Sequence, residues 1–273
     1  MKTFTVGMGL TVLLAGATVA AEEPTHRFMM VSDGVRIHYA ELGRGTPVVL
    51  IHGFSANSEG KWFKSGIAQA LAARFRVVAI DARGHGQSDK PHDPLKYGPR
   101  MATDVVELMD HLKIQRAHVH GYSMGGSILT QLLARYPNRI ITAIYGGSGV
   151  QETDPTWQAQ VPKDAEAPAT SDPNRPGGEN WSSYPGYDRV ALDAVQKYPW
   201  KPADRAIDLS KVSMPVLAIV GGFDNPNQRT HRLQRELKQF KLVVIPGETH
   251  GSAHLNPAYL TNLMQFLVAN DAR

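Results

Sequence analysis

The chain has 273 residues, of which 42% are hydrophobic and 20% charged, and a formal net charge of +4. These proportions are ordinary for a folded domain and exclude a disordered or collagen-like chain. So small a positive excess gives little support for a nucleic-acid partner. Cysteine is absent, which excludes disulfides, thiolate metal sites and a cysteine nucleophile.

The first 21 residues have the pattern of a secretory signal peptide. Lys2 is followed by a mostly apolar run from Phe4 to Val19, and Ala21 precedes two acidic residues. A positively charged start, an apolar run and small residues at the end predict cleavage after Ala21. The alternative, an uncleaved membrane anchor, needs about 20 apolar residues, more than this run supplies. We therefore expect a mature protein that begins at Glu22, keeps no stable membrane anchor and is secreted or periplasmic.

Apolar periodicity predicts strands that alternate with helices along the mature chain. Continuous runs such as Val48–Ile51 are typical of strands buried on both faces, and the 3.6-residue spacing of Val105, Leu108 and Leu112 is typical of a helix. The predicted elements are, in chain order, strand Arg36–Leu42, strand Pro47–His52, helix Trp62–Ala73, strand Arg76–Ile80, helix Met101–Leu112, strand His118–His120, helix Gly125–Tyr136, strand Ile140–Tyr145, helix Gly186–Tyr198, strand Val216–Val220, helix His231–Phe240, strand Lys241–Ile245 and helix Ala258–Val268. This alternation predicts an α/β fold with a mostly parallel central sheet and helices on both faces.

Residues 151–202 interrupt the alternation. They contain eight of the 18 prolines and three of the four tryptophans, and residues 161–178 follow neither a helical nor a strand period. Irregular segments of this length are usually functional or are linkers. We interpret 151–202 as a small cap inserted after the sixth core strand, with residues 22–150 and 203–273 forming the core. The alternative is a surface insertion with no part in binding.

The strongest chemical signal is Gly121-Tyr122-Ser123-Met124-Gly125, which directly follows a predicted strand and leads into a predicted helix. The Gly-x-Ser-x-Gly pattern needs this strand–turn–helix context, because a sharp turn presents the serine hydroxyl at the end of the sheet. Side chains in place of the glycines would clash in so tight a turn. The N-terminus of the following helix directs free N–H groups at any negative charge that develops beside Ser123.

The chain resembles the α/β-hydrolase fold family, in its serine esterase and lipase-like branch, from about Val31 to the C-terminus. Besides the serine motif, four segments carry the resemblance: His52-Gly53-Phe54, Asp81-Ala82-Arg83-Gly84-His85-Gly86-Gln87-Ser88-Asp89, Gly221-Gly222-Phe223-Asp224 and Gly247-Glu248-Thr249-His250. Together these motifs are specific for the fold, and they are not specific for a substrate.

A serine hydroxyl is a weak nucleophile that needs a base, and the base needs an acid to orient it. The family order is Ser, then Asp, then His. The resemblance therefore implies Ser123 as nucleophile, Asp224 as the orienting acid and His250 as general base. His254 is a rival base only four residues later, and Asp224 has an alternative interpretation as an N-cap or turn residue. Asp81 is expected to organise its own loop.

Other polar residues of these motifs have structural interpretations. The backbone N–H groups of Phe54 and Met124 are expected to form the oxyanion hole, with His52 as the scaffold of its turn. His85 is expected to be structural, like Asp89 in the same loop. His120 is expected to be a core or near-site histidine.

These residues predict a serine hydrolase that cleaves carboxylic esters through an acyl-enzyme intermediate. No cofactor or metal is expected, because no dinucleotide-binding glycine motif, P-loop or His-Glu-x-x-His sequence is present. Amidases, aminopeptidases, lactonases and C–C-bond hydrolases of the family share the triad and remain open. Ser123 argues against the dehalogenase and epoxide-hydrolase branches, whose pattern places Asp there. A binding protein that kept the fold and lost the chemistry is a more remote alternative.

The predicted partner is a small ester, and the number of subunits is left open. The cap aromatics suggest an apolar pocket for the acyl or alcohol group, with Trp157 and Trp181 assigned to substrate binding; packing of the cap on the core is the alternative. Residues 151–181 contain six acidic and two basic residues, a balance that disfavours strongly anionic substrates. The cap aromatics are Trp157, Trp181, Tyr184, Tyr187 and Trp200.

Overall fold

A computed structural model describes residues 22–166, 186–201, 204 and 206–271. The predicted signal peptide lies outside the described residues, as do Trp181 and Tyr184 of the predicted cap. None of the helices within the described ranges is both long and apolar enough to cross a bilayer.

Eight strands form one sheet in the order β1-β2-β4-β3-β5-β6-β7-β8. β2 runs antiparallel to its neighbours β1 and β4, and every other neighbouring pair is parallel. This confirms the predicted mostly parallel sheet. The strands are β1 (Thr25–Met30), β2 (Arg36–Leu42), β3 (Pro47–Ile51), β4 (Arg76–Ile80), β5 (Ala117–Tyr122), β6 (Ile140–Gly146), β7 (Val216–Gly221) and β8 (Phe240–Ile245). β1 was not predicted, because this edge strand is mostly exposed and has no apolar alternation.

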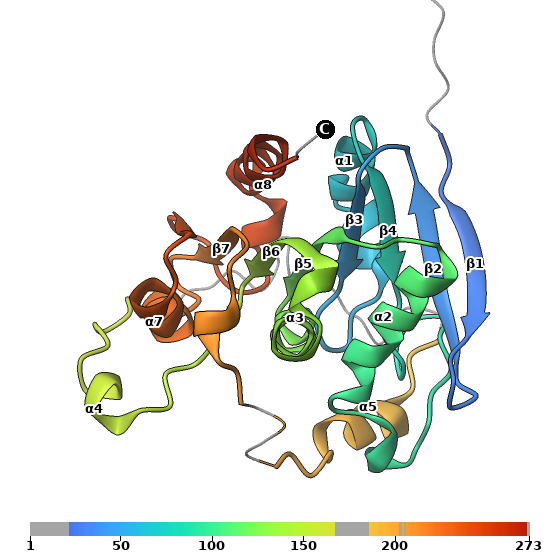
Figure 1. Ribbon diagram of the computed structural model, residues 1–273, viewed down its shortest axis with the longest axis horizontal. Coiled ribbons are helices and arrows are strands. Elements are labelled where there is room, and N and C mark those ends of the chain that lie inside the picture. Colours follow the sequence, from blue (N-terminus) through green and yellow to red (C-terminus); the bar gives the residue numbers. More distant parts are fainter. Residues whose placement is uncertain (1–21, 167–185, 202–203, 205, 272–273) are drawn as a thin grey trace, which may run out of the picture.

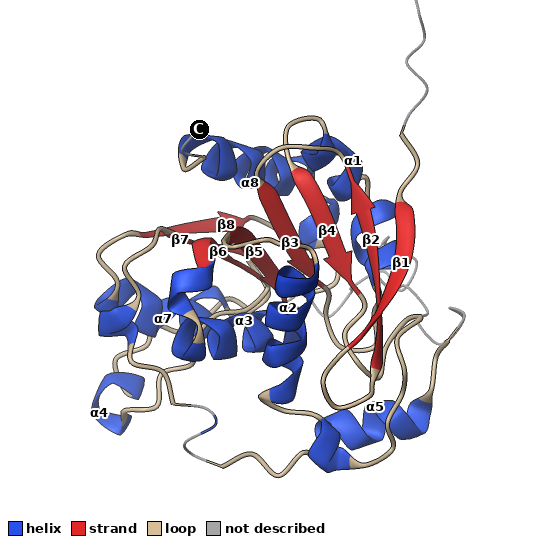
Figure 2. Ribbon diagram, turned by 45° about the vertical axis from the view of Figure 1, so that its right-hand side comes forward, coloured by secondary structure: helices blue, strands red, loops and turns tan. Residues whose placement is uncertain are grey.

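Helices cover both faces of the sheet, with α1 and α8 on one side and α2, α3 and α7 on the other (Figures 1 and 2). The strands supply a core to each side, because successive side chains point to opposite faces. In β3, Val48 and Leu50 pack in the core that contains α1 and α8, whereas Val49 and Ile51 pack in the other. The helices are α1 (Ile67–Ala72), α2 (Arg100–His111), α3 (Met124–Arg135), α4 (Pro155–Gln158), α5 (Arg189–Gln196), α7 (Pro226–Glu236) and α8 (Pro257–Ala269).

Two predicted helices differ most from their bounds in the structure. The helix expected over Trp62–Ala73 is divided into a π-helical turn at Glu59–Phe63 and α1. Gly66 separates them with a φ of 77°, a left-handed conformation that glycine adopts without strain. The helix expected over His231–Phe240 begins earlier, at Pro226, because its first turn is polar and has no apolar repeat.

The segment between β6 and β7 contains α4 and α5. α5 begins after Asp188, whose carboxylate accepts hydrogen bonds from the N–H groups of Val190 and Ala191. Its buried residues include Leu192 and Ala194, and it lies beyond the lower end of α2 in Figure 1. α4 lies apart from α5, below α7. Ala194 belongs to the core on the α2 side of the sheet, so this part of the segment packs on the core.

Candidate active site

Ser123 occupies a strained turn between β5 and α3. Its φ of 53° and ψ of −113° lie outside the regions that non-glycine residues ordinarily adopt. A Cβ atom at Gly121 would lie 2.1 Å from the carbonyl oxygen of Gly125, and one at Gly125 would lie 2.2 Å from that of Ile51. Both glycines are therefore needed for the close approach of β5, α3 and β3 that exposes the serine.

The structure brings Ser123, His250 and Asp224 into one hydrogen-bonded chain. His250 Nε2 lies 2.9 Å from Ser123 Oγ, and His250 Nδ1 lies 2.8 Å from Asp224 Oδ2. The three residues follow β5, β8 and β7, so they meet at the carboxyl edge of the parallel strands. With the Nδ1 proton donated to the carboxylate, the Nε2 lone pair is available to accept the serine proton.

Two contacts to the residues of this hydrogen-bonded triad were not predicted. Arg229, in α7, binds Asp224 through both its side-chain Oδ1 (2.9 Å) and its carbonyl oxygen (2.7 Å). The hydroxyl of Tyr122 donates to the carbonyl oxygen of His250 at 2.6 Å. Both contacts fix the positions of the acid and the base. No sequence motif contains Arg229. Tyr122 lies inside the serine motif, but the motif did not indicate a role for its side chain.

The turn that follows β3 lies directly against Ser123. A Cβ atom at Gly53 would lie 3.3 Å from Ser123 Cβ. In the part of the chain that the structure describes, the N–H groups of Phe54 and Met124 donate to no backbone acceptor. Met124 is the first residue of α3, where helical N–H groups have no partner within the helix. Met124 directly follows Ser123, and Phe54 directly follows Gly53 in the turn that lies against it; their role as the oxyanion hole stays a prediction.

His52 supports this turn from below. Its Nδ1 donates to the carbonyl oxygen of Gly53 at 2.7 Å, and its Nε2 accepts from the N–H of Ala82 at 3.0 Å. Burial lowers the pKa of His52, which favours the neutral ring. These two hydrogen bonds hold the turn after β3 in place, which is the structural role expected for His52.

The other histidines considered in the sequence analysis have no hydrogen bond to the serine hydroxyl. His254 is 5% exposed and packs on the ring of Tyr122, and burial lowers its pKa to about 3. His120 is bonded to the carbonyl oxygen of Ile144 and the hydroxyl of Tyr259. His85 is bonded to the carbonyl oxygen of Arg83. Of the two candidate bases, the structure places His250 against Ser123.

Asp81 and Asp89 hold the loop that follows β4. The Asp81 carboxylate accepts from the N–H groups of Ser58 (2.7 Å) and Gln87 (2.8 Å) and contacts His38 Nδ1 at 2.8 Å. Burial alone would raise the pKa of Asp81, but these hydrogen bonds and the nearby histidines hold it well below its usual range. Asp89 accepts from the N–H of Arg36 at 2.8 Å.

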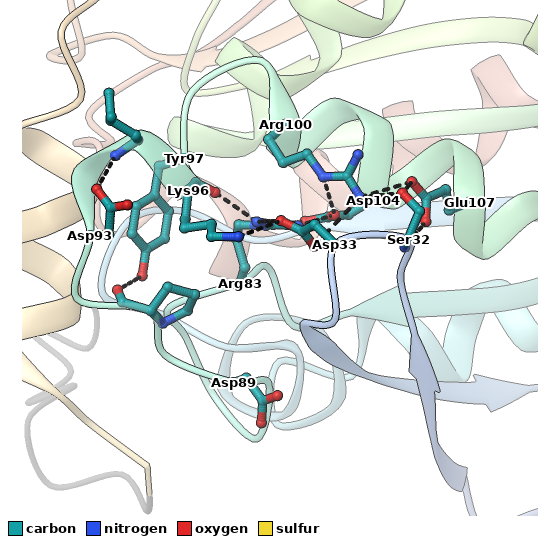
Figure 3. A network of polar contacts seen from close by, with 12 residues as sticks. Ser32, Asp33, Arg83, Asp89, Asp93, Lys96, Tyr97, Arg100, Asp104 and Glu107 are labelled. Atoms are coloured by element: carbon teal, nitrogen blue, oxygen red, sulfur yellow. Dashed lines mark hydrogen bonds and ion pairs between the residues drawn. The ribbon is translucent and has the colours of Figure 1, made fainter.

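Arg83, from the same loop, is the centre of a buried ionic network (Figure 3). It forms a bidentate ion pair with Asp104 of α2, in which Nε and Nη2 each lie 2.6 Å from a carboxylate oxygen. It also binds Asp33, in the turn between β1 and β2, at 3.0 Å and the carbonyl oxygen of Lys96 at 2.7 Å. The network fastens the β4 loop to α2 and to the edge of the sheet.

A cavity of about 540 Å³ opens beside Ser123. Eleven of its fifteen described lining residues are polar. Trp181 and Tyr184 lie outside the described residues, so the apolar pocket that the cap aromatics suggested stays a prediction. Among the described cap aromatics, Trp200 lines it, whereas Trp157 is 37% exposed and stacks under the guanidinium of Arg235. The lining residues are Ser123, Met124, Ser127, Thr130, Gln131, Ser148, Gly149, Val150, Gln151, Thr153, Trp200, Asn225, Gln228, Arg229 and Arg232.

Within the described ranges, no group of three or more histidine, aspartate or glutamate side chains is arranged to hold a metal ion.

The fold and the sequence place this chain in a known family. Residues 46–228 match the family model of the alpha/beta hydrolase fold. Because this match covers more than half of the chain, the chain belongs to the alpha/beta hydrolase fold family, as its motifs predicted.

Individual relatives differ in what they are named for. A soluble epoxide hydrolase from Corynebacterium sp. (strain C12) is 40% identical over 107 residues, which are 39% of this chain and 35% of that protein. The chain spans between 21% and 42% of the length of three curated relatives, the Corynebacterium epoxide hydrolase among them. A solved structure described as Est816, an N-acyl homoserine lactone degrading enzyme, has a TM-score of 0.68 and 28% identity, covering 89% of this chain and 99% of that one. A hydrolase from Pseudomonas aeruginosa, with a TM-score of 0.71 and 24% identity over 89% of this chain and 98% of that one, shows the same fold.

Proposed function

We propose that the protein is a serine hydrolase that cleaves carboxylic esters through an acyl-enzyme intermediate and works outside the cytoplasm. The observation that carries the proposal is the chain of contacts from Ser123 Oγ through His250 to Asp224, at 2.9 Å and 2.8 Å. In this arrangement one imidazole can take the serine proton and later return it.

The reaction has two halves. Ser123 Oγ attacks the ester carbonyl carbon while His250 Nε2 takes its proton, and the N–H groups of Phe54 and Met124 stabilise the negative carbonyl oxygen. The C–O bond to the alcohol then breaks, and His250 returns the proton to the departing alkoxide. A water molecule, deprotonated by His250, attacks the acyl-enzyme in the same manner and releases the carboxylic acid and free Ser123.

The comparisons support hydrolysis of an ester-type bond. Est816 is described as degrading a lactone, which is a cyclic ester, and it matches this chain over nearly its full length. A lactone is therefore the second candidate substrate class. The epoxide hydrolase relative matches a shorter segment, and the serine at position 123 argues against that chemistry here.

Replacing Ser123 with alanine tests the proposal. We expect Ser123→Ala to fold normally and to lose about 10⁴–10⁶-fold in kcat on 4-nitrophenyl esters. A fluorophosphonate probe should label the wild-type protein at Ser123, as read by peptide mass spectrometry, and leave the variant unlabelled. Retention of more than about a tenth of the activity, or an unlabelled wild-type protein, would contradict the proposed role and favour a binding protein.

Export is tested separately. Expression of the full chain in a Gram-negative host should give an exported protein whose N-terminal sequence begins at Glu22, because Ala21 ends the predicted signal. A cell-associated protein that retains Met1 would contradict cleavage.

A further inference from the structure

The wall of the cavity beside Ser123 carries positive charge. Arg229 and Arg232 line it, and no aspartate or glutamate is among the described lining residues. A volume of about 540 Å³ lies within the range of about 300–1,000 Å³ that is usual for small-molecule sites. The cavity is therefore large enough for a substrate that reaches both Ser123 and the two arginines.

Both arginines are held in place and still have unused donors. Arg229 uses Nε and Nη2 on Asp224. Arg232 uses Nε on Glu236 at 3.0 Å and Nη2 on the carbonyl oxygen of Ile207 at 2.9 Å. In the described part of the chain, Nη1 of each arginine has no hydrogen-bond partner. Among the described residues, each guanidinium group is thus anchored through two nitrogens and leaves Nη1 unbonded.

The two arginines lie at different distances from the triad along α7. Residues three apart lie on the same face of a helix, about 4.5 Å apart along its axis. Arg229 binds the acid of the triad, so Arg232 lies one turn further from it along α7. A substrate that reacts at Ser123 would place a group several bonds away near Arg232.

We propose that this cavity binds the carboxylate of an anionic ester, with Arg232 as the main specificity-determining residue; this rests on the proposed hydrolysis of esters at Ser123. The substrate class is a monoester of a dicarboxylic acid or an ester of a hydroxy acid. The planar guanidinium fork matches a carboxylate, and such charged hydrogen bonds are about twice as strong as neutral ones. Met124, Val150 and Trp200, also in the lining, are suited to contact the methylene groups between the two ends.

The paired acids do not cancel this preference. Asp224 and Glu236 bind the arginines, but neither lines the cavity, so the guanidinium groups lie between the carboxylates and the ligand. Arg232 has a side-chain exposure of 17%, and partly buried charges are screened less by salt than exposed ones.

Three of the six acidic residues in 151–181, whose number suggested the opposite preference, have other partners, and two more, Asp172 and Glu179, lie outside the described residues. Glu152 binds Arg235 at 2.7 Å, and Asp154 caps α4. Asp164 accepts from the N–H groups of Asn227 and Gln228 at the start of α7. None of these three lines the cavity.

Matched ester pairs test the proposal on both sides of the scissile bond. On the acyl side, mono-4-nitrophenyl adipate is compared with 4-nitrophenyl hexanoate, after subtraction of spontaneous hydrolysis. On the alcohol side, 4-acetoxybutyrate is compared with butyl acetate by pH-stat titration. We expect the anionic member of at least one pair to have a kcat/KM about tenfold higher or more.

The variants assign the preference to a residue. Arg232→Gln should reduce the anionic-to-neutral ratio of kcat/KM to about one, and Arg232→Lys should keep part of it. Arg235→Gln is the matched control, because it removes the same charge from the same helix at a residue outside the cavity lining; its ratio should stay at the wild-type value.

The outcomes separate this inference from the proposed function. Good hydrolysis of the neutral esters with no anionic preference in either pair would overturn the inference alone. An equal loss of preference in Arg232→Gln and Arg235→Gln would also overturn it, because the effect would then come from net charge. Absence of hydrolysis of all four esters would overturn the proposed function and the inference together.

Discussion

Gly147 packs against the acid and the base of the candidate triad. Its φ is 53°, and a Cβ atom there would lie 3.0 Å from Asp224 Oδ2 and 3.1 Å from His250 Nδ1. Both contacts are tighter than ordinary van der Waals separation. The residue after β6 must therefore be glycine both for its left-handed backbone and for the space that the Asp224–His250 hydrogen bond occupies.

We predict that Gly147→Ala lowers kcat by up to about 100-fold, because a displacement of about 1 Å in a catalytic group can cost that much. Stability should fall by about 1–2 kcal/mol from the left-handed backbone alone. Ester hydrolysis and urea unfolding measure the two effects. Gly34→Ala is the control, since Gly34 has a φ of +83° and nothing within 4 Å of its hypothetical Cβ; it should lose similar stability and keep its kcat. Equal activity of the two variants would contradict the prediction.

At the scale of elements, α7 depends on the cap segment for its N-terminus. Asn225 precedes the helix in a left-handed conformation and makes no side-chain capping bond. Asp164, 63 positions before Asn227, accepts from its N–H at 2.7 Å and from that of Gln228 at 3.0 Å. The described part of the cap segment is thereby fastened to the helix that carries Arg229 and Arg232.

Asp164→Ala is expected to destabilise α7 by about 1 kcal/mol, the usual effect of losing an N-cap. Residues 151–166 should then be cleaved faster by a protease and exchange amide hydrogen faster. Asp154→Ala serves as the comparison, because Asp154 caps only the short α4 through Thr156, so amide exchange in α7 should not change. Unaltered exchange in α7 of Asp164→Ala would show that the contact does not support the helix.

At the scale of the whole molecule, buried neutral histidines couple folding to pH. Burial lowers the pKa of five of them, to about 3 for His85 and His254 and to about 4 for His118 and His120. His52 is lowered as well. An unfolded histidine has a pKa near 6.5, so below that pH the unfolded chain binds protons that the folded chain does not. Stability must therefore fall as pH decreases through this window.

The free energy of unfolding in urea should thus decrease steeply between about pH 6.5 and pH 4.5, by up to about 1.4 kcal/mol per pH unit for each of these histidines. Asp104 opposes the trend, because burial raises its pKa to about 6 despite its ion pair with Arg83. Below about pH 4, protonation of Asp81, whose folded pKa is depressed, adds a further loss. Constant stability from pH 7 to pH 5 would contradict the prediction.

The sequence by itself predicted the sheet, most of its strands and the segments at which Ser123, Asp224 and His250 lie. These features depend on local patterns: apolar runs of buried strands, helical repeats, and glycines where a turn leaves no space for a side chain. Local patterning fails where a strand is exposed, as for β1, or where the first turn of a helix is polar, as for α7. The place of His250, directly after a predicted strand and a Pro-Gly turn, favoured it over His254, but no local pattern shows which of the two rings reaches Ser123.

The tertiary structure decided which side chains meet across long distances in the chain. It placed His250 rather than His254 against Ser123, 127 positions away. It paired Arg229 with Asp224, brought Asp164 to the start of α7, and placed Arg229 and Arg232 in the lining of the cavity beside Ser123. The number of charged and aromatic residues in a segment does not determine which way their side chains point. Whether a carboxylate faces a cavity or binds a helix behind it depends on packing between elements, and no local pattern contains that information.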